Sequence, residues 1–277
     1  MNPASRLWGN WLLAVYLIFF FLFLESPLVM ILLTSMNKGF GVTFPPQGLS
    51  SQWYLRLWDE IRNIPGVKPD LVRATWTSAW LGVSAMGGSI VAGVLVAFGL
   101  HRYRFPGRTV VQQCFLLPIL FPQIVTGVAL ALWFSAVHGV PVWARLVMAH
   151  LILTLPYVVI TTTASLETLD QRLEDAAMNL GANPLQTFWH ITLPGIRSGI
   201  ISGAVFAWLI SFANFTVTFF IYGSGVRPLP VWIYEVLQYL LDPSLAALST
   251  GLVLLTLTVL LILNRVFALG RLMGQRR

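Results

Sequence analysis

The sequence predicts an all-α integral membrane protein with six membrane-spanning helices. Hydrophobic residues make up 57% of the chain and charged residues only 10%, whereas about a quarter of the residues in an ordinary soluble domain are charged. The apolar residues form runs long enough to cross a bilayer, which takes about 20 residues per helix. Because lipid offers no hydrogen bonds to an open backbone, we expect each of these runs to fold as a helix.

Six apolar runs follow one another along the chain, at residues 11–35, 74–100, 110–137, 146–166, 198–222 and 245–267. The first run is longer than the apolar region of a signal peptide and no A-x-A cleavage site follows it, so we expect it to remain as the first span. The chain is therefore divided into the first span with its polar loop (1–73), a core of five spans (74–267) and a basic tail (268–277).

The distribution of arginine predicts the orientation. If the N-terminus is cytoplasmic, most arginines fall on the cytoplasmic side, and the opposite short loops hold only Arg145 and Arg227. The long loop after the first span also carries basic residues, but Asp59, Glu60 and Asp70 dilute them. The positive-inside rule favours two cytoplasmic termini and a periplasmic first loop. The arginines on the cytoplasmic side are then Arg6, Arg102, Arg104, Arg108, Arg172, Arg197, Arg265, Arg271, Arg276 and Arg277.

The polar loop between the fourth and fifth runs, residues 167–197, predicts two short helices joined by a turn. Thr168 with Gln171 fits a capping box, and Gly181 stands where a glycine ends a helix. Asn183 and Pro184 then suit the first positions of a second helix. Isolated helices this short are marginal in water, so a partner that covers their apolar side is expected. The apolar residues are Leu169, Leu173, Ala176, Ala177, Leu180, Leu185, Phe188, Trp189 and Ile191.

The spacing in this loop resembles a known family. Asp175-Ala176-Ala177, then Gly181, then Ile191 and Leu193-Pro194 match the EAA loop of permeases from type I ABC (ATP-binding cassette) importers, with Asp175 in place of the first glutamate. The resemblance extends over nearly the whole chain and is closest to the second permease of spermidine/putrescine-type systems. It includes the segments Gln52-Trp53-Tyr54, Tyr103-Arg104-Phe105 and Leu155-Pro156-Tyr157.

This resemblance implies a function and a set of partners. The chain would be one permease of an ATP-driven, binding-protein-dependent importer in the bacterial inner membrane. Its partners would be a second, non-identical permease, two ATPase subunits and a substrate-binding protein outside. The loop would be a coupling helix that docks on the ATPase, through Glu174, Asp175, Ala176, Ala177, Gly181, Asn183, Ile191, Leu193 and Pro194.

The closest group uses two different permeases, which favours a heterodimer for this chain as well.

The substrate stays open at this point. The resemblance suggests a polyamine or another small amine-bearing solute, while an opine, an aminoalkylphosphonate, 4-aminobutyrate or ferric iron fits the wider group. Permeases of the polyamine type often have acidic residues where this chain has Ala213 and Asn214. Specificity is expected to depend mainly on the binding protein.

The chain lacks the motifs of an enzyme. A P-loop needs Gly-x4-Gly-Lys-Ser/Thr, but the only two lysines, Lys38 and Lys68, are followed by Gly39 and Pro69. We therefore expect no catalytic site and no bound cofactor, with ATP and Mg²⁺ used by the partner ATPase. The four histidines lack metal-ligand spacing, so no metal site is predicted. Basic residues lie between apolar runs rather than along one polar face, which argues against nucleic-acid binding.

Several residues inside the spans are candidates for a translocation pathway. Asn214, Thr216 and Thr218 are polar groups in the fifth run, with hydrogen bonding between helices as the alternative. The prolines Pro118, Pro122 and Pro156 are expected to interrupt the third and fourth runs, either as tolerated kinks or as backbone that lines a cavity. Glu25 is a carboxylate within the first span, where the alternative to a functional role is a neutralised side chain.

A passive channel is the alternative from another functional class. A channel would typically show a repeated ring of polar or charged residues, and no such repeat stands out. The small residues Gly199 and Gly203 in the fifth run, and Gly88, Gly93 and Ala97 in the second, suit close helix packing instead. We expect this packing to occur mainly within the subunit.

Overall fold

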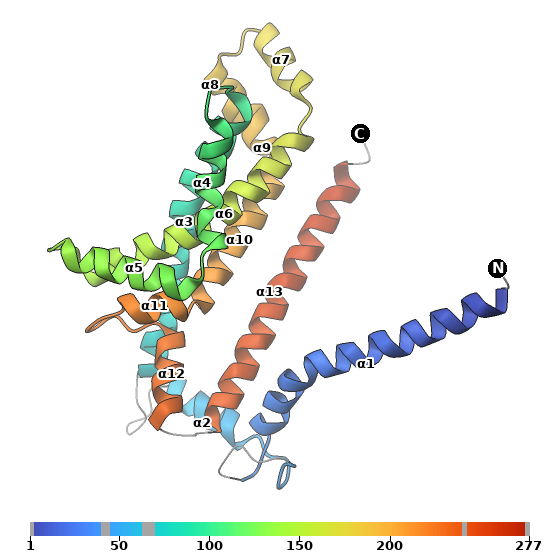
Figure 1. Cartoon of the computed structure of the whole chain (residues 1–277), viewed down its shortest axis with the longest axis vertical. Helices are drawn as coiled ribbons and strands as arrows, with labels where there is room; N and C mark the ends of the chain where they lie inside the picture. Colours follow the sequence, from blue (N-terminus) through green and yellow to red (C-terminus); the bar gives the residue numbers. More distant parts are fainter. Residues whose placement is uncertain (1–2, 40–44, 63–69, 240–242, 275–277) are drawn as a thin grey trace. The chain divides into compact units, whose positions relative to one another are not determined.

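The computed structural model describes residues 3–39, 45–62, 70–239 and 243–274, and these residues are almost entirely helical (Figure 1). In the described part of the chain, extended pairing is limited to two isolated bridges, Asn37 with Leu49 and Gly223 with Val226. The helices are α1 (Pro3–Ser35), α2 (Gln52–Ile61), α3 (Asp70–Arg102), α4 (Arg108–Leu120), α5 (Gln123–Ala136), α6 (Val142–Thr168), α7 (Gln171–Asn179), α8 (Pro184–Thr187), η1 (Phe188–Thr192, a π-helix), α9 (Leu193–Gly195), α10 (Arg197–Ala213), α11 (Thr216–Ile221), α12 (Leu229–Tyr239) and α13 (Ser244–Gly274).

Within the described residues, four helices are each long and apolar enough to cross a membrane, and the number rises to six if each of two bent helix pairs forms one span. The four are α3, α6, the Trp11–Ser35 part of α1 and the Ser244–Ile262 part of α13. The bent pairs are α4 with α5, at 103°, and Pro184–Gly195 with α10, at 68°. The all-α, multi-span prediction is therefore confirmed, and each bent pair is either a broken span or a re-entrant loop.

The third run breaks at one proline only. Helix α4 ends at Leu120, and Pro122 is the residue that precedes α5. Pro118 lies inside α4 and Pro156 lies inside the unbroken α6, so for these two prolines the structure supports the alternative of a proline tolerated within the helix. Membrane helices tolerate such prolines because neighbouring groups satisfy the freed backbone.

The fifth run is also divided, which the sequence did not predict. The expected helix 198–222 stops at Ala213, and α11 begins at Thr216. The side-chain oxygen of Asn214 accepts hydrogen bonds from the backbone N–H groups of Val217 (3.0 Å) and Thr218 (3.4 Å). An asparagine side chain that bonds nearby backbone in this way competes with a continuous helix, which explains the break.

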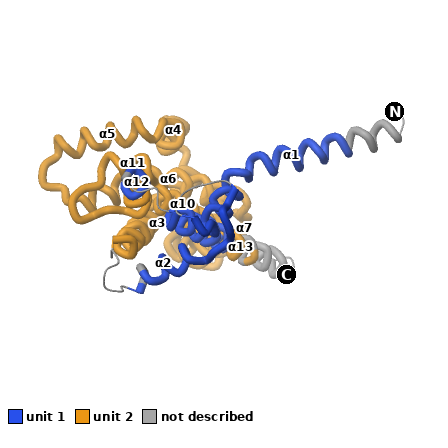
Figure 2. The backbone as a smooth tube through the Cα atoms, turned by 90° about the horizontal axis from the view of Figure 1, so that it is seen from below, with its two compact units in different colours: residues 1–69, 235–259 blue, residues 70–234, 260–277 orange. Residues whose placement is uncertain are grey.

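The chain forms two compact units (Figure 2), one of residues 1–69 with 235–259 and the other of residues 70–234 with 260–277. In the second unit, α3, α6 and α10 pack against one another and α11 packs against α5. Two clusters of buried apolar side chains lie in this unit. The first consists of Leu81, Phe134, Leu146, Ala149, Leu153, Val217 and Ile221, and the second of Val94, Ala97, Leu166 and Ile196.

Small residues let the three central helices approach closely. A Cβ atom added to Gly203 of α10 would lie 2.8 Å from the Cα atom of Val158 in α6. A Cβ atom added to Gly93 of α3 would lie 2.8 Å from the Cγ1 atom of the same valine. Val158 is thus held between two glycines from two different helices. These contacts support the interpretation that the small residues serve packing within the subunit.

In the first unit, polar side chains fasten α2 to the end of α1. The indole N–H of Trp53, a residue that is 2% exposed, donates to the carbonyl of Asn37 at 2.7 Å. The hydroxyls of Ser35 and Tyr54 lie 2.6 Å apart in a hydrogen bond. Residues 11–24 of α1 are all exposed, and their apolar side chains suit a lipid-facing helix.

Replacing Gly203 by valine is expected to destabilise the core of the second unit by about 1–3 kcal/mol, because the added side chain meets the backbone of Val158. Thermal unfolding in detergent measures the effect. Gly87→Val is the matched control, since a Cβ atom at Gly87 meets no atom within 4 Å. Equal melting temperatures for the two variants would contradict this account of the packing.

Candidate functional site

The loop predicted to carry the function folds as two short helical segments, α7 and the continuous run α8–η1–α9. The N-cap of α7 is Asp170, whose side chain accepts from the backbone N–H of Arg172 at 3.0 Å. The predicted capping box of Thr168 and Gln171 is therefore wrong. Thr168 still belongs to α6, and its hydroxyl donates to the carbonyl of Ser165 at 2.9 Å.

The glycine that was predicted to end the first helix does so. Gly181 has a φ of +94°, in the left-handed region that favours glycine. Its N–H donates to the carbonyl of Met178 at 3.0 Å, and the N–H of Ala182 donates to the carbonyl of Ala177 at 3.1 Å. This pair of bonds is a Schellman motif, which satisfies carbonyls at the end of α7.

The second segment begins as the sequence predicts. The Asn183 side chain accepts from the backbone N–H of Gln186 at 2.8 Å, and the Gln186 side chain accepts from the backbone N–H of Asn183 at 2.9 Å. Pro184 occupies the first helical position. This reciprocal capping box and the Schellman motif fix the turn between the two segments without help from a partner.

Most of the predicted coupling residues lie on the surface of this loop. Asp175, Ala176, Gly181, Asn183 and Pro194 are exposed, while Ala177, Ile191 and Leu193 are partly buried. Large apolar side chains are also exposed, above all Leu180 (90%) and Leu185 (67%). A surface pocket between the two segments is lined by Ala177, Leu180, Ala182, Gln186, Thr187, His190 and Ile191.

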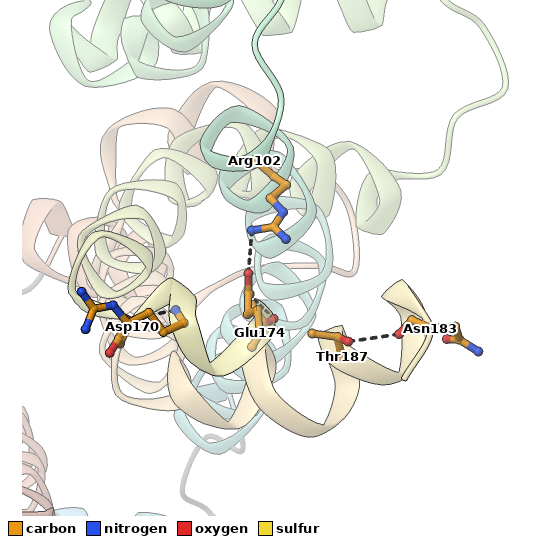
Figure 3. A network of polar contacts seen from close by, with 7 residues as sticks. Arg102, Asp170, Glu174, Asn183 and Thr187 are labelled. Atoms are coloured by element: carbon orange, nitrogen blue, oxygen red, sulfur yellow. Dashed lines mark hydrogen bonds and ion pairs between the residues drawn. The ribbon is translucent and has the colours of Figure 1, made fainter. Parts of the chain in front are cut away.

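Glu174 differs from its neighbour Asp175, because it points into the protein (Figure 3). Its side chain is 7% exposed, and its Oε2 atom accepts from Nη1 of Arg102 at 2.6 Å. Its Oε1 atom accepts from the hydroxyl of Thr192 at 2.5 Å. The prediction that grouped Glu174 with the surface residues missed this inward position. Successive helical residues point about 100° apart, so helical periodicity already indicated that Glu174 and Asp175 face different directions.

Two of the polar candidates in the divided fifth run, Asn214 and Thr218, are hydrogen-bonded to each other. Asn214 and Thr218 are buried, and the Thr218 hydroxyl donates to the carbonyl of Asn214 at 2.6 Å. His150 of α6, which is 0% exposed, places Nδ1 2.7 Å from the Ser211 hydroxyl and Nε2 3.0 Å from the Thr218 hydroxyl. Hydrogen bonding between helices is therefore what the geometry supports for Asn214 and Thr218. Thr216 is partly exposed.

The remaining pathway candidates belong to different helices. Pro122 is exposed at the bend between α4 and α5, and Pro118 is partly buried in α4. Glu25 is partly buried in α1, which belongs to the first unit. Among the described residues, no group of three or more histidine, cysteine, aspartate or glutamate side chains could hold a metal ion. The described geometry thus points to the loop as the candidate site.

A family profile decides the class of protein. The family described as "Binding-protein-dependent transport system inner membrane component" matches residues 89–271, a stretch that includes the whole loop. The chain belongs to this family. It is therefore a multi-pass inner-membrane permease, a component of a transport system.

Curated relatives agree with this assignment. The permease is 32% identical over 258 residues to the putrescine transport system permease protein PotI of Escherichia coli K12, covering 90% of this chain and 88% of the relative. It is 28% identical to the spermidine/putrescine permease PotC of Haemophilus influenzae, covering 87% and 90%. It is also 29% identical to the sulfate transport system permease CysT of Salmonella typhimurium, covering 78% and 82%.

Solved structures share the fold of the permease. A bacterial ABC transporter involved in the import of the acidic polysaccharide alginate matches with a TM-score of 0.70 at 15% identity, covering 96% of this chain and 98% of that chain. An amino acid ABC transporter matches with a TM-score of 0.53 at 15% identity, covering 73% and 92%. The ABC importer fold that the sequence resemblance implied is confirmed.

Gly181→Val is expected to open the last turn of α7, because a left-handed conformation costs a residue with a Cβ atom about 1–2 kcal/mol. That cost corresponds to a roughly fivefold to thirtyfold rise in opening, which amide hydrogen exchange at residues 177–182 measures. Gly181→Asn is the control, because asparagine adopts this conformation more readily. Unchanged exchange in the valine variant would contradict the role of the turn.

Proposed function

We propose that this permease is one of the two permease subunits of an importer for putrescine, spermidine or a similar small polyamine. The observation that carries the proposal is the 32% identity to the putrescine permease PotI over 90% of the chain. The PotC relatives add support at 27–28% identity. Sulfate is the second candidate, because CysT shares 29% identity over 78% of the chain.

We further propose that the loop 167–197 lies in the cytoplasm and docks on an ATPase subunit, with both termini on the same side. The arginines support this orientation. The loop has the features of a docking surface: a structured turn, exposed apolar side chains such as Leu180 and Leu185, and a pocket between its two segments. The carboxylate of Asp175 is exposed and able to pair with a basic side chain.

The proposed cycle uses a second, non-identical permease, two ATPases that hydrolyse ATP with Mg²⁺, and an external binding protein. Closure of the ATPases moves the docked loops, and the membrane helices then change from inward-facing to outward-facing. The permease needs no ATP site of its own in this scheme. Membership of a binding-protein-dependent family favours this scheme over the passive channel.

The substrate is tested by uptake in lipid vesicles that contain the complete transporter and its binding protein. We expect ATP-dependent accumulation of labelled putrescine or spermidine, with sulfate as the matched comparison. Vesicles with a non-hydrolysable ATP analogue serve as the control. Accumulation of sulfate but not of either polyamine would reject the polyamine proposal and support the second candidate.

Docking of the loop is tested by co-purification of the ATPase. We expect Leu180→Glu to lower ATPase recovery at least about tenfold, because a charge replaces an apolar side chain at the centre of the proposed interface. Ser224→Glu is the control, since Ser224 is exposed but lies outside the loop. Full ATPase recovery with the Leu180 variant would place the interface elsewhere.

A further inference from the structure

Glu174 is a buried charge that joins three separate segments of the second unit. It belongs to α7, while Arg102 is the last residue of α3 and Thr192 is the last residue of η1. Arg102 lies 72 positions and Thr192 lies 18 positions from Glu174 along the chain. A buried carboxylate is tolerated when a cation and hydrogen-bond donors surround it, and both are present here.

The backbone alone connects α7 to α6 weakly. Leu169, between α6 and α7, is extended, with φ −74° and ψ 127°. At the other end, the left-handed Gly181 turns the chain toward α8. The junction at Leu169 does not continue α6, so it can absorb a displacement of α7, whereas the capped turn at Gly181 keeps α7 and α8 together. Among the described residues, Glu174 makes the side-chain hydrogen bonds and the ion pair that connect α7 with other helices.

Apolar contacts beside the ion pair also connect the loop with α3. The rings of Phe98 in α3 and Phe188 in η1 meet edge to face, with centroids 4.9 Å apart. Phe188 and Leu193 pack against the cluster of Val94, Ala97, Leu166 and Ile196. The second segment of the loop is thus packed on α3 and α6, whereas α7 packs on α8 and η1 and is joined to α3 by Glu174.

We propose that the Arg102–Glu174–Thr192 contacts, here called the brace, transmit the displacement of α7 to α3 and to η1, which leads into α10. The proposal rests on the proposed docking of the loop on an ATPase, but not on the identity of the substrate. Glu174 is then a positioning residue, whereas Asp175 faces outward. Energetic coupling follows contiguous packed or bonded groups of this kind.

The test compares ATP hydrolysis with transport in vesicles that hold the complete transporter. Glu174→Gln keeps the size of the side chain and removes the ion pair, and Arg102→Met removes the same pair from the other side. We expect each variant to retain the bound ATPase and its basal hydrolysis, while solute transported per ATP falls about tenfold, within the usual 5–150-fold range of coupling between sites. Thr192→Val should have a smaller effect, because the ion pair remains.

Exchanging the two charges tests whether restoring the ion pair restores transport. The double variant Glu174→Arg/Arg102→Glu restores an ion pair between the same two positions, and transport per ATP is expected to recover substantially. Asp59→Asn is the control, because Asp59 is an exposed carboxylate outside the loop 167–197. This control is expected to transport like the wild type.

Two results would overturn the proposal. One is wild-type transport per ATP in both single variants. The other is a loss of transport that follows a loss of bound ATPase, because the brace would then only shape the docking surface. A wild-type complex that captures no ATPase would instead reject the proposed docking. A wild type that imports sulfate would reject the polyamine proposal and leave the test of the brace intact.

Discussion

The second unit depends on the close approach of α3, α6 and α10 around Val158. Lipid chains are as apolar as the helix surfaces, so the hydrophobic effect does little to hold membrane helices together. Close contact between the helix surfaces must hold them together instead, and such contact requires small residues. Gly93 and Gly203 allow α3 and α10 to reach Val158 from two directions. This approach also brings the end of α3 and the start of α10 to the loop, where Arg102 and Thr192 meet Glu174.

The two helix breaks are connected to each other. Pro122 ends the turn before α5, and Asn214 separates α10 from α11. The side-chain amide of Asn214 donates to the side-chain oxygen of Gln123, the first residue of α5, at 3.1 Å. Non-helical backbone within a membrane needs such internal partners. Asn214 therefore satisfies the backbone of α11 and links both breaks with the same side chain.

The sequence predicted what depends on local chemistry. The apolar runs, the turn at Gly181 and the cap at Asn183 each follow from residue type and short-range spacing. It did not predict the break at Asn214, because an apolar run does not show that the Asn214 side chain competes for the backbone N–H groups of the helix. The inward position of Glu174 and the bonds of His150 to Ser211 and Thr218 involve partners at least 18 positions away. Such contacts depend on how whole helices pack, which periodicity does not show.

The caps of the loop have a consequence for the thermodynamics of assembly. Asp170, the Schellman motif at Gly181 and the Asn183–Gln186 box order the backbone of both segments in the isolated subunit. A flexible loop would lose conformational entropy on association, at a cost that weakens binding. If an ATPase docks on this loop as proposed, it meets a surface that is already ordered. Its affinity would then depend on the fit of the two surfaces rather than on the folding of one of them.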